Sequence, residues 1–175
     1  MALLLKDGLP VEDPWISLDD AVEAIPDGPV IVSLDRWRRD RAVLVARNSP
    51  VGVRLKSSQR TGEIAPDLDR VALVALEFPK FRDGRAFSTA RELRERYGYT
   101  GEIRAVGHTL PDQYQFLIRT GFSTVAVPDG ANLATWQHAL TEIGVAYQAG
   151  VAGDTPLSLL RRKVHLAAAP HPQGD

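Results

Sequence analysis

The stretch RVALVALEF, residues 70–78, decides the fold class of this chain. Every position from Val71 to Leu76 is apolar, and Glu77 is the first charge that follows. A strand that is apolar at successive positions is covered on both faces, which is typical of a parallel sheet rather than of a half-exposed hairpin. The sequence therefore predicts a buried parallel strand that ends near Glu77.

Strands and helices alternate on both sides of this stretch. Apolar runs predict strands at residues 30–32, 51–55, 71–76, 102–107, 122–127 and 145–148. Helical spacing and end signals predict helices at about residues 18–25, 34–47, 89–97, 111–120, 132–143 and 156–166. Two of these helices are assigned from capping residues. Ser17 and Asp20 form a capping-box pattern at the start of the helix at 18–25. Residues 43–46 alone resemble a strand, but Ser33 as a cap and the helical spacing of the apolar residues that follow it favour a helix at 34–47.

This alternation implies right-handed crossovers between parallel strands. We predict one α/β domain over residues 1–169, an open doubly wound fold with a mostly parallel sheet of five or six strands and helices on both faces. A partial (βα) barrel is the alternative, because the same alternation begins either architecture. Residues 170–175 are expected to form a mobile tail.

Composition excludes several classes of function. The 175 residues carry a formal charge of −1, which gives no bulk attraction to nucleic acid or anionic lipid. The basic runs RWRRDR and RELRER contain acidic neighbours and are better explained as solvated helix faces. No apolar run approaches the roughly 20 residues of a membrane helix, and MALLLKDGLPVEDP is not a secretory signal, so we expect a cytoplasmic protein.

Sulfur is nearly absent from the chain, with no cysteine and one methionine at position 1. This excludes cysteine nucleophiles, disulfides and cysteine-ligated metals within the chain, and the histidines have no metal-binding spacing. We predict no metal and no cofactor. The scarcity of sulfur has two explanations, a chance effect of an Ala- and Arg-rich composition or synthesis when sulfur is limiting.

The carboxyl ends of the predicted strands are where a site is expected, because ligands bind there in both architectures. Lys56, Lys80, Arg82 and Arg85 lie on these loops and would suit an anion, aided by a helix that Ser88 would cap. The alternatives are a solvated turn made by Asp83 and Gly84, or a protein contact patch in which Phe78, Phe81 and Phe87 join the arginines.

Glu77 and His108 are weak candidates for a catalytic base and acid, provided that their side chains converge. The alternative for His108 is a capping hydrogen bond near Thr109 and Asp112. The common nucleotide-binding, hydrolase and zinc motifs are absent from the sequence, and no other catalytic constellation is found.

The segment from Phe78 to Phe122 resembles a bacterial family, the domain of unknown function 934. The pattern consists of F-P-x-F-x-D-G-R, S-x-A-x-x-L-R, G-Y-x-G-E-x-R-A-x-G, D-Q and R-x-G-F, and the wider resemblance covers about residues 29–127. It includes Asp83, Arg104, Asp112 and Gln113. Members are often encoded beside assimilatory sulfite reductase, and some carry an oxidoreductase label, so the resemblance implies a role in sulfate or sulfite assimilation.

Three functions follow as hypotheses. The first is an accessory protein that docks on sulfite reductase or its electron donor through the loop edge. The second is an enzyme or sensor that binds a small oxyanion or a phosphorylated metabolite at the strand ends, and the third is a structural domain without a ligand. The residues assigned to anion or partner binding are Lys56, Lys80, Arg82, Asp83, Arg85, Arg104, Asp112 and Gln113.

Overall fold

A computed structural model describes residues 3–80 and 82–141 of the chain. These residues form one mixed sheet of eight strands in the order β2-β1-β8-β7-β6-β5-β4-β3. The strands are β1 (Leu3–Lys6), β2 (Leu9–Val11), β3 (Ile16–Ser17), β4 (Val30–Ser33), β5 (Val51–Leu55), β6 (Leu73–Phe78), β7 (Glu102–Gly107) and β8 (Thr124–Val127). The helices are α1 (Leu34–Val45), α2 (Arg85–Glu95), α3 (Tyr114–Arg119) and α4 (Leu133–Thr141), with short 3₁₀ turns η1 (Thr61–Glu63), η2 (Ala65–Asp67) and η3 (Pro111–Gln113).

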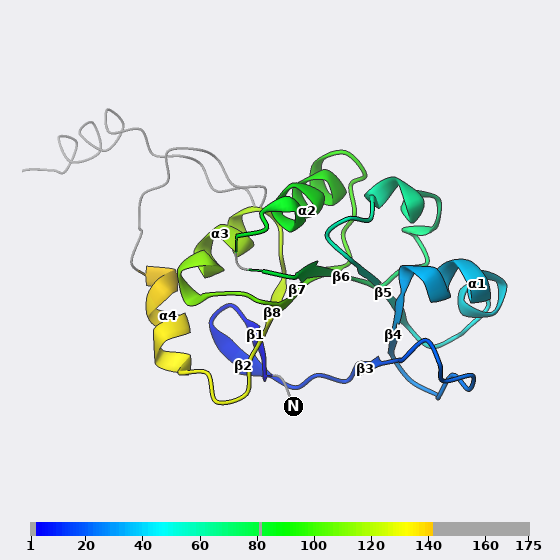
Figure 1. Cartoon of the computed structure of the whole chain (residues 1–175), viewed down its shortest axis with the longest axis horizontal. Coiled ribbons are helices and arrows are strands. Elements are labelled where there is room, and N and C mark those ends of the chain that lie inside the picture. The colour runs from blue at the N-terminus through cyan, green and yellow to red at the C-terminus, as the bar shows by residue number, and fades with distance from the viewer. Residues whose placement is uncertain (1–2, 81, 142–175) are drawn as a thin grey trace, which may run out of the picture.

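The sheet curls into a half-barrel with the helices on its outer side (Figure 1). Strands β3 to β8 are parallel, and each pairs with the strand that follows it in the chain. When strand order follows chain order, right-handed crossovers all return over the same face of the sheet. The doubly wound prediction with helices on both faces is therefore wrong, as is the count of five or six strands. The α/β class is confirmed, and the curl agrees with the partial-barrel alternative.

A hairpin that the sequence reading missed forms one edge of the sheet. Strand β1 pairs antiparallel with both β2 and β8. Its turn consists of Asp7 and Gly8, which both have positive φ, 51° and 80°. An Asp-Gly pair between apolar residues is a signal for a two-residue hairpin of this kind, so the sequence did contain the evidence.

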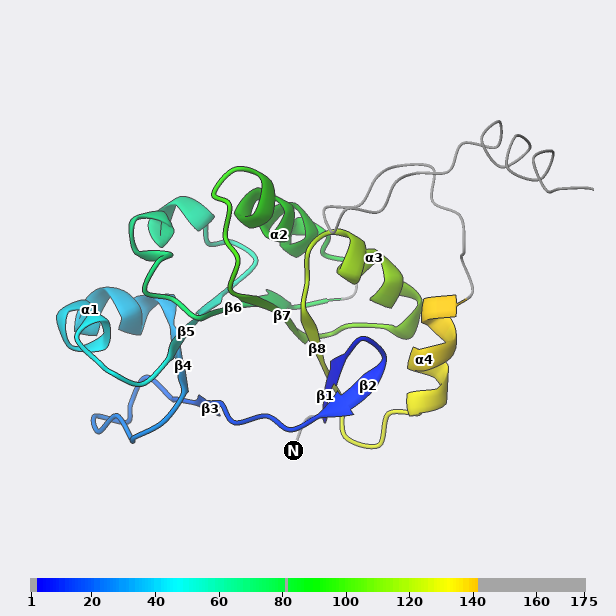
Figure 2. The ribbon, with the colours of Figure 1, turned by 180° about the vertical axis from the view of Figure 1, so that it is seen from behind.

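The segment between β2 and β3 crosses the open side of the curl. It leads from the hairpin at one edge of the sheet to β3 at the opposite edge, as Figure 2 shows from behind. Trp15, in this segment, packs against a buried cluster of Ile31, Leu73 and Ala75 on the concave face. The concave face is therefore covered in part by the chain's own N-terminal region.

The long apolar run at residues 71–76 is covered on both faces. Val74, Leu76 and Phe78 join the main core under the helices, whereas Leu73 and Ala75 belong to the concave cluster. The prediction of a parallel strand buried on both sides is thus confirmed. None of the helices in residues 3–80 and 82–141 is long and apolar enough to span a membrane.

The two capping predictions had opposite outcomes. Ser33 caps α1, because its Oγ accepts a hydrogen bond from the Arg36 backbone N–H at 3.0 Å. The helix predicted at residues 18–25 is absent from the structure, and Asp20 instead accepts a hydrogen bond from Ser33 Oγ at 2.6 Å. The Asp20 carboxylate, predicted to cap a helix at 18–25, thus lies at the start of α1 instead.

Helix α2 begins before the predicted cap. Gly84 occupies the N-cap position, and Asp83 Oδ1 accepts from the backbone N–H of Arg85 at 3.2 Å, so Ser88 lies inside the helix. The strand predicted at residues 145–148, the helix at 156–166 and the tail lie outside the described residues.

Candidate functional site

One row of side chains on the concave face brings two arginines together. In the register of the sheet, Arg54 of β5 lies beside Ala75 of β6, and Ala75 lies beside Arg104 of β7. Neighbouring strands are about 4.8 Å apart, so the two arginine Cα atoms are separated by roughly 10 Å. Because strand residues alternate between faces, the apolar neighbours Val53, Leu55, Ile103 and Ala105 point to the helices while the arginines point inward.

These arginines line a cavity of about 710 Å³ inside the curl. Small-molecule sites in proteins are commonly about 300–1,000 Å³, so its volume suits an organic ligand. The described lining comes from the β2–β3 segment, from β3 to β8 and from the loop after β7: Asp13, Ser17, Ile31, Arg54, Ala75, Arg104, Val106, Gly107, His108, Thr109, Leu110, Ala126, Val127 and Pro128.

Arg104 is buried, and two carboxylates compensate its charge. Its Nη1 donates to Asp13 Oδ2 at 2.8 Å, and its Nε donates to Glu102 Oε1 at 2.9 Å. Thr124 Oγ1 donates to the same Glu102 oxygen at 2.6 Å. This network fixes the guanidinium in place and holds the β2–β3 segment against β7.

Arg54 contrasts with Arg104 because it is exposed and uncompensated. Its side chain makes no hydrogen bond or ion pair with any residue that the structure describes. An exposed guanidinium at the wall of a cavity presents five N–H donors in a planar fork, which matches a carboxylate or another oxyanion. Arg54 is therefore a cation available to a ligand.

Thr109 supplies a second unused polar group at this cavity. The residue is 4% exposed, and its buried Oγ1 has no hydrogen-bond partner among the residues that the structure describes. A buried hydroxyl without a partner costs about 1–3 kcal/mol, so such groups are unusual unless something else satisfies them. The Oγ1 atom is not accessible from the cavity in this conformation, so a ligand would reach it only after the side chain turns.

The predicted acid–base pair is not formed in the described structure. His108 lines the cavity, and its backbone N–H donates to Phe78 O at 2.8 Å. Glu77 lies beside Val106 in the register, outside the described lining, and no hydrogen bond joins its side chain to that of His108. The capping alternative for His108 is not observed either, since its side chain makes no hydrogen bond with the described residues. The turn that follows is capped by Gln113, whose Oε1 accepts from the Leu110 N–H at 3.2 Å.

The loop at residues 78–85 forms a local ion pair at the strand ends. Arg85 Nη2 donates to Asp83 Oδ2 at 2.6 Å and to Ser57 Oγ at 3.0 Å. The hydrogen bonds from Arg85 hold the pKa of Asp83 well below its usual value. The predicted proximity of the loops after β5 and β6 is thus observed, with Asp83 and Arg85 bound to each other.

The predicted site residues fall into two groups. Arg104 and His108 line the cavity, whereas Lys56, Lys80, Arg82, Asp83, Arg85, Asp112 and Gln113 lie outside its described lining. The residues that sequence reading missed are Asp13, Arg54 and Thr109. The signal for Arg54 was a charged residue near the middle of a predicted buried strand, in VGVRL, as Arg104 is in EIRAVG.

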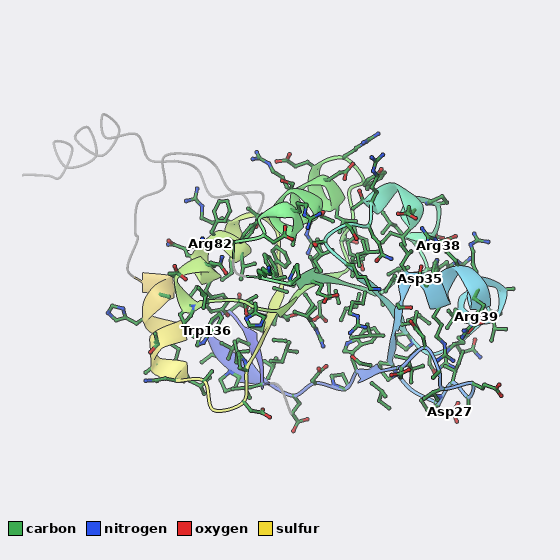
Figure 3. All side chains as sticks on the ribbon, viewed as in Figure 1. Asp27, Asp35, Arg38, Arg39, Arg82 and Trp136 are labelled. Carbon is green, nitrogen blue, oxygen red and sulfur yellow. The ribbon has the colours of Figure 1, made fainter. Side chains whose placement is uncertain are left out.

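The run RWRRDR is neutralised locally on α1. Arg38 pairs with Asp35 at 3.1 Å, Arg39 pairs with Asp40 at 2.9 Å, and Arg41 pairs with Asp67. Figure 3 shows Arg38 and Arg39 on the outer side of the molecule, away from the concave face. Among residues 3–80 and 82–141, no three His, Asp or Glu side chains gather as a metal site would need.

Residues 52–158 match the family described as "Bacterial protein of unknown function (DUF934)". The chain belongs to this family. The predicted family is confirmed, while the association with sulfite reductase stays a prediction. No curated protein matches the chain.

Several residues of the DUF934 pattern have a structural role here. Arg94 donates to the backbone carbonyls of Tyr99, Gly101 and Gly121, the last two at 2.8 and 3.0 Å, and to Ser123 Oγ at 3.0 Å. Burial lowers the pKa of this guanidinium. Gly121 has a φ of 105°, and a Cβ there would lie 2.6 Å from Arg94 Cγ. The arginine thus joins the turns after α2 and α3, and this part of the pattern maintains the fold.

Proposed function

We propose that this protein binds a small organic acid in the cavity of the half-barrel. The observation that carries the proposal is Arg54, whose guanidinium has no partner among the described residues and lies on the wall of a cavity of about 710 Å³. Thr109 also lines this cavity, and its buried Oγ1 has no hydrogen-bond partner among the described residues. Of these two groups, the guanidinium of Arg54 suits the acidic end of a ligand.

The size of the cavity favours an organic ligand that carries an acidic group over a bare oxyanion such as sulfate. A water molecule takes a share of about 30 Å³ in the liquid, and a sulfite or sulfate ion is only a few times larger. Much of the lining is apolar, including Ile31, Ala75, Val106 and Ala126. The acidic group would bind Arg54 while the rest of the ligand contacts these side chains.

Thermal unfolding with a panel of compounds tests this proposal. The panel contains carboxylic acids, phosphorylated metabolites, sulfate and sulfite, and a ligand at one hundred times its dissociation constant should add about 2.7 kcal/mol of stability. We expect Arg54→Ala to abolish the stabilisation. Arg91→Ala should preserve it, because Arg91 lies on α2 and pairs with Glu95 at an exposed position. A panel without a stabilising compound, or equal stabilisation of Arg54→Ala, would contradict the proposal.

The metabolic setting that we propose is the assimilation of sulfate or sulfite. It rests on the family resemblance, and the near absence of sulfur from the chain agrees with it. Growth of a deletion strain on sulfate and on cysteine tests the setting. A defect on sulfate that cysteine relieves would support it, and equal growth on both sulfur sources would contradict it.

Docking on sulfite reductase or its electron donor is the second candidate function. The observation that favours it is an exposed ring next to the loop at residues 78–85: Phe116 is 54% exposed and contacts Phe87 with ring centroids 4.8 Å apart. Exposed aromatic residues beside arginines are common in protein interfaces. Co-purification of the tagged protein with sulfite reductase, compared with the variants Asp83→Ala and Arg85→Ala, tests this function. Equal recovery of the reductase with all three proteins, or with none, would argue against it.

A further inference from the structure

We infer that the ligand of the cavity is a zwitterion, with its acidic group on Arg54 and an ammonium group at Asp13. The inference rests on the proposed function and specifies the chemical class of its ligand. An amino acid with an apolar side chain is the simplest member of this class.

The distribution of charge around the cavity carries the inference. Arg104 contributes one positive charge and contacts two carboxylates, those of Asp13 and Glu102, so this group of three carries a net charge of −1. Arg54 carries one positive charge without a partner among the described residues. The four side chains together are neutral, but the positive and negative ends of the site are separated.

The register of the sheet places these ends on opposite sides of Ala75. Arg54 is one strand away on β5, and Arg104 is one strand away on β7 with Asp13 bound to it. Ala75 itself is 1% exposed, so a ligand in the cavity would bridge the two ends through the long side chain of Arg54 and the carboxylate of Asp13. The site thus has a positive end at Arg54 and a negative end at Asp13, and a ligand with a negative and a positive group can bind to both.

A simple anion suits this dipole less well than a zwitterion does. Binding an anion to Arg54 would leave the cavity with a net negative charge beside the buried Arg104 network, and an uncompensated charge in a partly dehydrated site is costly. A zwitterion leaves the total at zero. It also places a cation where the carboxylates outnumber the guanidinium.

Asp13 retains the capacity to accept further hydrogen bonds. Its Oδ2 accepts from Arg104 at 2.8 Å, and its Oδ1 accepts from the Trp15 backbone N–H at 3.2 Å. An ionised carboxylate offers about four lone-pair sites, so roughly two remain. The Asp13 side chain is 27% exposed and belongs to the cavity lining, which makes it accessible to an ammonium group.

Calorimetric titration of the full-length protein with matched compounds tests the inference. The common L-amino acids are titrated first, and each that binds is compared with its analogue without the amino group and its analogue without the carboxylate. For leucine these analogues are 4-methylpentanoate and 3-methylbutylamine. We expect the amino acid to bind at least about tenfold more tightly than either analogue. Arg54→Gln should remove the preference over the analogue without the carboxylate and keep the preference over the analogue without the amino group, which depends on Asp13. Arg91→Ala should leave the three affinities unchanged.

The remaining outcomes distinguish this inference from the proposed function. Equal or tighter binding of the analogue without the amino group would overturn the zwitterion and leave the organic-acid site intact. If sulfate or sulfite binds and no organic compound does, the result would overturn the zwitterion and also the argument that the ligand has an apolar part. No binding by amino acids, their analogues or other acids would overturn both.

Discussion

Asp13 and Arg104 lie 91 positions apart in the sequence, and their side chains form an ion pair of 2.8 Å at the cavity wall. The pair attaches the segment between β2 and β3 to the middle of β7, across the open side of the half-barrel (Figure 2). Trp15 in the same segment packs on Ile31, Leu73 and Ala75. In a complete barrel further strands would occupy this side, whereas here a short segment anchored by one carboxylate does so.

The ion pair gives a prediction for Asp13→Asn that depends on the ligand. Removal of the negative charge should weaken binding of a zwitterion, by about tenfold, and strengthen binding of the matched acid without an amino group. The reason is that the asparagine no longer attracts an ammonium group, and Arg104 then has only one carboxylate partner. Titration calorimetry with both compounds measures the two changes. Asp35→Asn on the outer side of α1 is the control, and changes of the same sign for both compounds would contradict the prediction.

Thr109→Val should separate ligand binding from stability. The substitution removes a buried hydroxyl that has no partner among residues 3–80 and 82–141, so unfolding should require about 1 kcal/mol more free energy. Ligand affinity should fall as well, because valine cannot form a hydrogen bond with the bound ligand. Denaturant unfolding and calorimetry measure these two effects. Thr109→Ser keeps the hydroxyl and should retain affinity; a valine variant with both lower stability and normal affinity would show that the hydroxyl serves the fold alone.

The sequence predicted the class of the fold but left its architecture open. Alternating strands and helices, and an apolar run at residues 71–76, require parallel strands connected by crossovers. Whether the crossovers cover one face or two depends on strand order, which is a property of the tertiary structure that no local pattern contains. The missed hairpin is different, since Asp7 and Gly8 did provide a local signal.

The site was predicted less well than the fold for a related reason. The general rule about strand ends drew attention to the loop at residues 78–85, where Asp83 and Arg85 pair with each other. A curled sheet adds a second place for a ligand, its concave face, and there charged residues in the middle of strands become exposed to a cavity. Arg54 and Arg104 would have been grouped from the sequence only if the neighbouring positions of β5, β6 and β7 had been known.

Arg94→Lys tests the structural role assigned to part of the DUF934 pattern. Lysine keeps the positive charge but cannot make the same set of hydrogen bonds to Gly101, Gly121 and Ser123, so buried carbonyls would lose their donors. We expect a loss of at least about 2 kcal/mol in the free energy of unfolding. Arg91→Lys on the same helix should have little effect, since its pair with Glu95 is exposed. Equal stability of the two variants in urea would contradict the role.

Asp67→Asn should destabilise the protein in a way that depends on pH. Asp67 Oδ2 accepts from Arg41 Nε at 2.7 Å and from Trp37 Nε1 at 3.2 Å, and these contacts, led by the hydrogen bonds from Arg41, lower the pKa of Asp67. A carboxylate with a lowered pKa stabilises the folded state fully above its unfolded pKa of about 4, and this contribution is lost as pH falls through the folded pKa. We therefore expect a deficit of about 1–3 kcal/mol at pH 7, because asparagine is a weaker acceptor than the carboxylate for Arg41 and Trp37. The part of this deficit that comes from the charge of Asp67 should disappear as pH falls below about 4. Urea unfolding across this range, with the exposed Asp69→Asn as control, measures the deficit. A deficit that stays constant down to about pH 2 would show that the charge of Asp67 does not contribute to stability.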